Sequence, residues 1–160
     1  IKSQAELFMI SDLLRNDLSR IEFPRAFIVK KKAPKLVPGL LHQYSQIDVE
    51  LSDSINIWRV IEKIFPGGSI TGAPKLRAMR LIEKLENRKR GFYCGSTMIF
   101  YKQMKSSSIN IRSSVIDFNH NELLYQAGGA ITLLSKVDDE FKEMTYKHDS
   151  FIHTLTVDNC

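Results

Sequence analysis

The sequence predicts an α+β fold with a largely antiparallel sheet flanked by helices. Helical periodicity recurs in the first half of the chain and again near its C-terminal end. The second half carries three short apolar stretches that follow one another through polar turns. Successive strands joined by short turns pair in antiparallel fashion, and helices grouped apart from such a sheet are typical of the α+β class.

In the first half, apolar spacing predicts two helices and two strands. The expected segments are a helix over 5–16, a strand over 25–29, a strand over 47–51 and a helix over 54–65. The first helix carries one apolar stripe, formed by Met9, Ile10 and Leu13. The second helix is expected to turn four side chains inward, namely Ile57, Trp58, Ile61 and Ile64.

In the second half, the pattern predicts a helix, three strands and a closing helix. The expected segments are a helix over 76–85, strands over 95–101, 107–118 and 123–127, and a helix over 138–155. Pro74 suits the opening of the first of these helices, where its missing N–H costs nothing. Residues 119–121 mark a turn between the last two strands. Alternation along 107–118 separates one apolar face, formed by Ile109, Ile111 and Val115, from Arg112.

Composition indicates a soluble globular domain, or part of one, in a reducing cytoplasm. The 160 residues are 43% apolar and 26% charged, and no apolar run approaches the length of a membrane span. Cys94 and Cys160 lie far apart and form no disulfide framework. The net charge of +5 suits a small anionic substrate. The basic clusters at 30–35 and 88–90 lack interleaved aromatic residues, so we interpret them as solvated loops rather than nucleic-acid contacts.

The stretch from 65 to 75 is the most informative part of the chain. It places three glycines, two hydroxyl side chains and Pro74 directly before the helix over 76–85. Glycines let backbone approach a ligand closely, and the free N–H groups at a helix start attract anions. We therefore interpret the stretch as a loop that opens a helix onto an anionic ligand, with an ordinary turn and helix cap as the alternative.

Carboxylates on two predicted helices could hold a hard cation. Glu6 shares the apolar stripe of the first helix, where a carboxylate without a partner is costly. Glu140, Glu143 and Lys147 cluster beside the apolar face of the last helix. Carboxylate oxygens are ligands that Mg²⁺ prefers. The alternatives are a half-solvated Glu6 near its helix start and a surface ion pair between Glu143 and Lys147.

Three further features could bind a carboxylate or act on a substrate. Arg112, on the strand over 107–118, either binds a carboxylate through its guanidinium group or is a residue at the rim. The glycine turn at 127–130 offers unhindered backbone N–H groups, or forms a simple bulge. His42 stands in a mixed stretch, where a single histidine is more often structural than catalytic.

Several motifs, taken in order along the chain, resemble those of the chorismate-utilising enzymes. Residues 65–75 resemble the family signature, and the string Gly-Gly-Ser-Ile-Thr-Gly-Ala-Pro-Lys within it is nearest to the aminodeoxychorismate synthase branch. Further family patterns match 5–17, 42–45, 109–112, 127–129 and 140–147. The resemblance implies part of a chorismate-binding domain fold. It also implies replacement of the chorismate 4-hydroxyl by ammonia, on the route to p-aminobenzoate and folate.

The resemblance implies a role for each candidate residue. The Mg²⁺ ligands would be Glu6, Glu140 and Glu143. The substrate-binding residues would be Ser69, Thr71, Gly72, Arg112, Gly128, Gly129, Ala130 and Lys147. His42 would line the active site as the catalytic histidine. Chorismate is the implied substrate, a glutamine amidotransferase subunit is the implied ammonia-supplying partner, and neither nucleic acid nor membrane is implied.

The chain also departs from the family pattern. Met98 and Ile99 stand where the family has Gly-Tyr, so a substrate-contacting tyrosine is missing. Ala130 and Leu134 replace a glycine and a polar residue, and Ser3 replaces an acidic one. The resemblance assigns residues 1–160 to the C-terminal portion of the domain, without the Pro-Ile-Lys-Gly-Thr segment whose lysine forms a covalent intermediate. We therefore expect no turnover by this chain alone, and a dimer formed through surfaces exposed by truncation.

Two alternatives stay open at this point. Anthranilate synthase component I is the second enzyme hypothesis, and the residue at the lysine position of the upstream segment would decide between the two enzymes. A non-catalytic binding or assembly module is the alternative from another class. It predicts affinity for Mg²⁺ or chorismate without any product.

Overall fold

The computed structural model describes residues 2–21, 25–37 and 40–157, and the chain folds as two compact units. One unit comprises residues 1–85 and the other residues 86–160. Every strand pair among the described residues is antiparallel, and helices accompany the strands in both units. The predicted α+β class is therefore confirmed, with the strands divided among three two-stranded ribbons.

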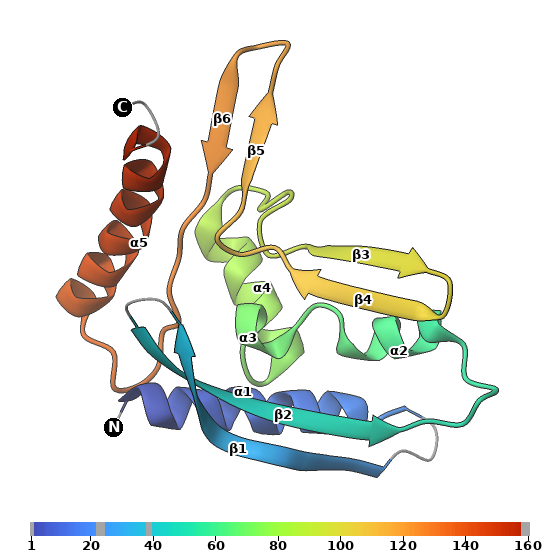
Figure 1. Cartoon of the computed structure of the whole chain (residues 1–160). Helices are drawn as coiled ribbons and strands as arrows, with labels where there is room; N and C mark the ends of the chain where they lie inside the picture. Colours follow the sequence, from blue (N-terminus) through green and yellow to red (C-terminus); the bar gives the residue numbers. More distant parts are fainter. Residues whose placement is uncertain (1, 22–24, 38–39, 158–160) are drawn as a thin grey trace. The chain divides into compact units, whose positions relative to one another are not determined.

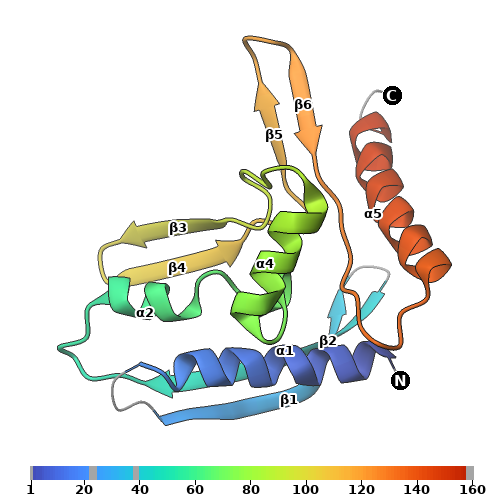
Figure 2. The same ribbon diagram turned by 180° about the vertical axis from the view of Figure 1, so that it is seen from behind.

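The first unit combines one long hairpin with helices. Its elements are α1 (Lys2–Leu18), β1 (Arg25–Val37), β2 (Leu40–Glu50), α2 (Ile57–Ile64), α3 (Gly68–Thr71) and α4 (Lys75–Glu86). Strands β1 and β2 pair with Ile28 opposite Ile47, and α1 lies along this hairpin (Figures 1 and 2). Leu18, Ile21 and Val60 form the buried core, so this core joins α1, the hairpin and α2.

Strand β1 is longer than the sequence indicated, and the lysines at 30–32 and 35 lie on it rather than in a loop. Strand β2 supplies pairing partners along β1, and register shifts between Ile28 and Ala33 accommodate the positive φ of 51° at Lys32. The ammonium groups of Lys31 and Lys32 lie 4.7 and 3.9 Å from the centre of the Phe8 ring. These cation–π contacts give Lys31 and Lys32 a partner on α1, which a sequence pattern does not reveal.

Helix α2 begins later than predicted and turns Trp58 outward. The side chain of Asn56 caps the helix, because its Oδ1 accepts a hydrogen bond from the Trp58 N–H at 2.9 Å. The buried stripe has the spacing expected of a helix face and consists of Ile57, Val60, Ile61 and Ile64. Trp58 lies off this stripe and is 60% exposed, so its predicted inward placement is wrong.

The second unit carries two hairpins and the last helix. Its elements are β3 (Ser96–Tyr101), β4 (Met104–Ile109), β5 (Ser114–Asp117), β6 (Glu122–Tyr125) and α5 (Val137–Val157). The β3–β4 and β5–β6 hairpins are separate ribbons (Figure 1). Asp117 accepts hydrogen bonds from the N–H groups of Asn119 and His120 at 2.9 and 3.2 Å, which confirms the predicted turn at 119–121.

The strand expected over 107–118 is interrupted at residues 110–113. Asn110 is buried, its N–H donates to the Gly95 carbonyl, and its own carbonyl accepts from the Cys94 N–H, both at 2.9 Å. Arg112 has a φ of 55°, in the left-handed region and outside any strand conformation. The prediction that Arg112 lies on a continuous strand, opposite one shared apolar face, is therefore wrong.

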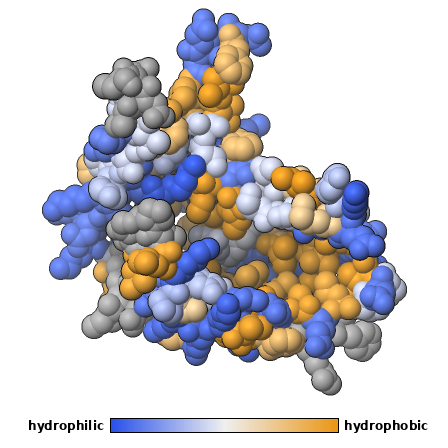
Figure 3. Space-filling view, viewed as in Figure 1, coloured by the Kyte–Doolittle hydropathy of each residue, from blue (hydrophilic) through white to orange (hydrophobic). Residues whose placement is uncertain are grey.

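Large apolar side chains are exposed in both units. They include Leu36 and Leu76 in the first unit, and Phe118 and Leu133 in the second. Figure 3 shows such apolar residues, in orange, interspersed with hydrophilic ones in blue. Among the residues that the structure describes, no helix is long and apolar enough to cross a membrane. The predicted dimer stays a prediction.

Candidate functional site

Lys147 connects two of the predicted site regions in the second unit. Its ammonium group donates a hydrogen bond to the Gly128 carbonyl at 2.9 Å and pairs with Glu143 Oε1 at 2.6 Å. The Lys147 side chain is only 18% exposed, whereas that of Glu143 is 51% exposed. The structure therefore brings the glycine turn and the predicted residues of the last helix into direct contact.

Helix α5 is held in place by aromatic packing one turn beyond Lys147. The rings of Tyr125 and Phe151 stack, with centroids 3.9 Å apart and planes within 3° of each other. The Tyr125 hydroxyl also lies 3.4 Å from the Lys147 carbonyl, to which it donates a hydrogen bond. Because Tyr125 ends β6, this packing fixes the helix against the strand that leads into the glycine turn.

A cavity of about 320 Å³ lies beside the glycine turn and the first turns of α5. Most of its lining is apolar, and Glu140 and Ser135 are its polar side chains; the lining residues are Gly129, Ile131, Ser135, Val137, Glu140, Phe141 and Met144. A Cβ placed on Gly129 would lie 3.5 Å from Glu140 Oε2, so the half-buried carboxylate of Glu140 reaches the glycine turn. No sequence pattern singles out Ser135, which is a common residue type in an ordinary loop.

Arg112 and Ala130 are placed less centrally. Both are exposed, and neither is among the residues that line the cavity. Arg112 lies in the segment between β4 and β5, where its left-handed backbone differs from the strand position that was expected. Its proposed contact with a substrate carboxylate stays a prediction.

The half-buried turn at residues 90–95 adjoins the glycine turn. Gln126 Nε2 donates to the Arg90 carbonyl at 3.1 Å, while Arg90 itself forms a two-pronged ion pair with Glu86, at 2.8 and 2.6 Å. The hydrogen bond from Arg90 lowers the pKa of Glu86 below its ordinary value of 4.5. Burial raises the pKa of Tyr93 and of Cys94.

The predicted site residues of the first unit lie on three different elements. His42 lies exposed on β2, opposite Lys35 of β1. Ser69 and Thr71 belong to α3, a short helix inside the glycine-rich stretch that the sequence pattern did not predict. The Thr71 hydroxyl donates to the Gly67 carbonyl at 2.9 Å. Gly72 follows α3 with a φ of 129°, a conformation that favours glycine.

The glycine-rich stretch packs against α1 at both of its ends. A Cβ on Gly68 would lie 3.0 Å from the Leu13 Cβ, so α3 approaches α1 closely. At the other end, Lys75 Nζ lies 2.6 Å from Asp17 Oδ2, and both side chains are largely buried, with 20% and 8% exposed. The stretch is therefore anchored by packing at one end and by an ion pair at the other.

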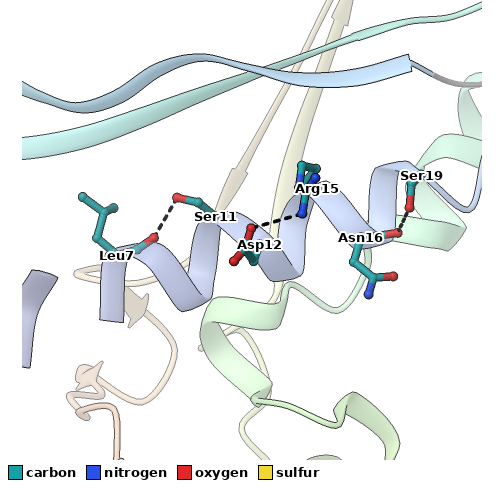
Figure 4. A network of polar contacts seen from close by, with 6 residues as sticks. All are labelled: Leu7, Ser11, Asp12, Arg15, Asn16 and Ser19. Carbon is teal, nitrogen blue, oxygen red and sulfur yellow. Dashed lines mark hydrogen bonds and ion pairs between the residues drawn. The ribbon is translucent and has the colours of Figure 1, made fainter. Parts of the chain in front are cut away.

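Helix α1 carries Glu6, whose side chain lies outside the described part of the structure. Several polar side chains further along α1, and Ser19 just after it, make local contacts, shown in Figure 4. Ser11 and Ser19 donate to the carbonyls of Leu7 and Asn16, both at 2.7 Å. Hydroxyls that bond the preceding turn of their own helix satisfy their hydrogen-bonding capacity there. These contacts belong to the helix itself and leave the predicted role of Glu6 untested.

The donor set on α5 suits a hard divalent cation. Glu140 and Glu143 lie one turn apart on the same helix, and both offer carboxylate oxygens. Within the side chains that the structure describes, no group of three or more candidate ligands could hold a metal ion. The two carboxylates of α5 would therefore need further ligands to complete a protein-bound site.

Comparisons with known proteins identify the family of this chain. The family described as chorismate binding enzyme matches residues 1–153. Aminodeoxychorismate synthase component 1 of Salmonella typhimurium is 37% identical over 97% of this chain and 34% of its own length. The chloroplastic aminodeoxychorismate synthase of Arabidopsis thaliana is 40% identical over 91% of this chain and 16% of its own length.

Anthranilate synthases are similar as well. Component 1 from Aquifex aeolicus is 31% identical over 98% of this chain and 32% of its own length. The crystal structure of component I from Streptococcus pneumoniae TIGR4 matches 94% of this chain and 34% of that chain, with a TM-score of 0.76 and 29% identity. The chain thus spans about a third or less of the length of these relatives. It belongs to the chorismate-binding enzyme family.

Proposed function

We propose that this chain supplies the carboxylate-binding and metal-binding part of an enzyme that converts chorismate to 4-amino-4-deoxychorismate. Several relatives at 34–40% identity carry the name aminodeoxychorismate synthase. The glycine-rich string at 67–75 also favours that branch. The proposal depends mainly on the hydrogen bond from Lys147 to the Gly128 carbonyl. This bond places a positively charged side chain next to the backbone of the glycine turn.

Lys147 is the proposed anchor for a carboxylate of chorismate. A nearly buried ammonium group attracts an anion strongly, since little water screens its charge. The backbone N–H groups of Gly129 and Ala130 are proposed to hold the same anion, with Arg112 approaching from the segment before β5. Glu143 competes with this anion for Lys147, because the two residues form an ion pair in the structure.

Glu6, Glu140 and Glu143 are the proposed ligands of Mg²⁺. The metal, when bound, supplies Lewis acidity that assists departure of the 4-hydroxyl group. Glu143 would turn its carboxylate from Lys147 toward the cation, and this change leaves Lys147 available for substrate. The half-buried Glu140, which lines the cavity, would bring that cation close to the glycine turn.

Residues of the first unit are also proposed to act on the substrate. His42 is the proposed general acid or base, since imidazole exchanges protons near neutral pH. The hydroxyls of Ser69 and Thr71, and the backbone at Gly72, are proposed to bind the substrate. A glutamine amidotransferase subunit is the proposed source of ammonia. Relatives named "component 1" support this proposal, because the name implies an enzyme with more than one subunit.

Calorimetric titration of chorismate into the chain, with and without Mg²⁺, tests this proposal. We expect Mg²⁺-dependent binding by the natural sequence, and its loss in Glu143→Ala. Glu122→Ala is the matched control, because Glu122 is an exposed glutamate of the same unit on β6. Loss of binding in the control as well would point to general unfolding, and no binding by the folded natural chain would refute the proposal.

Anthranilate synthesis is the second candidate, favoured by the structural match to an anthranilate synthase component I. The two activities release different products from the same substrate. Adding the chain to extracts that hold a glutaminase subunit, followed by chromatography of products formed from chorismate, separates them. Aminodeoxychorismate supports the first candidate, anthranilate the second, and binding without product supports a non-catalytic module.

A further inference from the structure

The segment from 126 to 129 is held by the turn at residues 90–95 through two neighbouring contacts. The first is the hydrogen bond from Gln126 Nε2 to the Arg90 carbonyl, at 3.1 Å. The same carbonyl accepts the Tyr93 N–H at 3.2 Å, so one acceptor ties both segments together. The second contact is made by the Tyr93 side chain, which lies directly against Gly128.

The turn at 90–95 is well suited to act as a fixed support. The Arg90 guanidinium is fastened to Glu86, and Cys94 holds a left-handed φ of 63°. The backbone of the buried Asn110 bonds to Cys94 and to Gly95, both at 2.9 Å, on the far side of the turn. A left-handed residue other than glycine persists only where its surroundings fix it, as these hydrogen bonds do here.

The Tyr93 hydroxyl occupies the space where Gly128 would carry a side chain. A Cβ built on Gly128 would lie 2.6 Å from Tyr93 Oη, closer than real Cβ contacts allow, but 3.7 Å from Cζ, an ordinary contact distance. The clash therefore comes from the hydroxyl oxygen alone. On the carbonyl side of the same residue, Lys147 Nζ donates its hydrogen bond at 2.9 Å. Gly128 is thus fixed between a tyrosine hydroxyl and a lysine ammonium group.

We propose that Tyr93 is a positioning residue of the carboxylate site. Its hydroxyl sets the backbone of Gly128, so that the Gly128 carbonyl faces Lys147 and the following N–H groups face the anion. This proposal rests on the proposed function of the glycine turn. It assigns Tyr93 no contact with substrate, and it explains why position 128 requires glycine although no positive φ is found there.

A size-exchange experiment tests the proposal. Gly128→Ala should clash with the Tyr93 hydroxyl and weaken Mg²⁺-dependent chorismate binding about tenfold or more, because an overpacked contact shifts the backbone. Tyr93→Phe removes only the hydroxyl oxygen that would clash. The double variant, Gly128→Ala with Tyr93→Phe, should therefore bind chorismate with the same affinity as Tyr93→Phe alone. Tyr101→Phe is the matched control, since Tyr101 is an exposed tyrosine of the same unit. Combined with Gly128→Ala, it should not restore chorismate binding.

A second readout separates this proposal from the proposed function. The ¹H–¹⁵N resonances of Gly128 and Gly129 should move in Gly128→Ala and return toward their original positions in the double variant, without any ligand. Restored resonances in a chain that binds no chorismate would support the role of Tyr93 and refute the function. If Gly128→Ala does not fold, recovery of the fold by Tyr93→Phe also supports the role. Failure of Tyr93→Phe to reverse the effect overturns it.

Discussion

The ammonium group of Lys147 lies 2.9 Å from the carbonyl oxygen of Gly128, and it joins α5 to the segment that follows β6. The two residues lie 19 positions apart in the sequence, yet both belong to patterns that the family resemblance singled out. One hydrogen bond therefore gives the second unit both a structural link and a cation beside a glycine turn.

Replacing Lys147 with methionine should destabilise the second unit. The substitution keeps the length of the side chain and removes the bond to Gly128 together with the pair to Glu143. Hydrogen bonds to charged groups contribute about 1.5–3 kcal/mol, so the free energy of local opening of α5 should fall by roughly 2 kcal/mol. Hydrogen exchange of the α5 amides measures this change. Lys142→Met on the exposed face of α5 should leave that exchange unaltered.

Glu143→Gln should affect chorismate binding in opposite directions with and without metal. In a chelating buffer, the neutral amide no longer competes for Lys147, and affinity should rise by up to about fivefold, the range for a half-exposed ion pair. With Mg²⁺ present, loss of a carboxylate ligand should lower affinity. Calorimetry in the two buffers measures both effects. A decrease in both buffers would show that Glu143 does not compete with the substrate.

The pair between Asp17 and Lys75 should contribute strongly to the first unit. Asp17→Asn leaves a largely buried ammonium group beside a neutral amide, and breaking such a pair costs about 3 kcal/mol or more. Urea unfolding followed by fluorescence of Trp58, the single tryptophan, measures the loss in this unit. Asp12→Asn is the control, because the Asp12–Arg15 pair is exposed and longer, at 3.4 Å. Equal losses of unfolding free energy in the two variants would contradict the conclusion that burial makes the Asp17–Lys75 pair important.

The turn that carries Tyr93 should loosen in acid. The hydrogen bond from Arg90 lowers the pKa of Glu86, so the ionised carboxylate is favoured in the folded state. A lowered folded-state pKa gives a contribution to stability that is present above the ordinary pKa of 4.5 and is lost as pH falls through the lowered value. The Arg90 Nε–H and Tyr93 amide resonances should shift together over that range. In Glu86→Gln, the Arg90 Nε–H and Tyr93 amide resonances should no longer depend on pH over this range.

Local periodicity was sufficient for the elements that depend on local sequence. The helix over 138–155 and the turn at 119–121 were predicted correctly, because apolar spacing and a short run of polar turn residues fix them. The break at Asn110 was missed, since it depends on hydrogen bonds to a turn more than ten residues away. The inward orientation predicted for Trp58 was wrong, because the Asn56 cap determines where α2 begins.

The candidate site was predictable only in part. Glycine spacing and the carboxylates of the last helix pointed to Gly128, Glu140, Glu143 and Lys147, and the structure places these residues close together. Tyr93 carried no such signal, because its importance comes from a contact with Gly128 across 35 positions of chain. Arg112 was assigned a strand conformation that the backbone does not adopt. Contacts that form only on folding account for each of these differences.

The most direct test of the central claim is a calorimetric titration of chorismate into Lys147→Met and Lys142→Met in the presence of Mg²⁺. The claim is that the Lys147 ammonium group, on a side chain that is 18% exposed, holds a carboxylate of the substrate at the glycine turn. We expect Lys142→Met to bind as the natural chain does, and Lys147→Met to lose at least about tenfold in affinity, as expected when a charged hydrogen bond is removed. Equal affinity in the two variants would contradict the claim and place the substrate elsewhere.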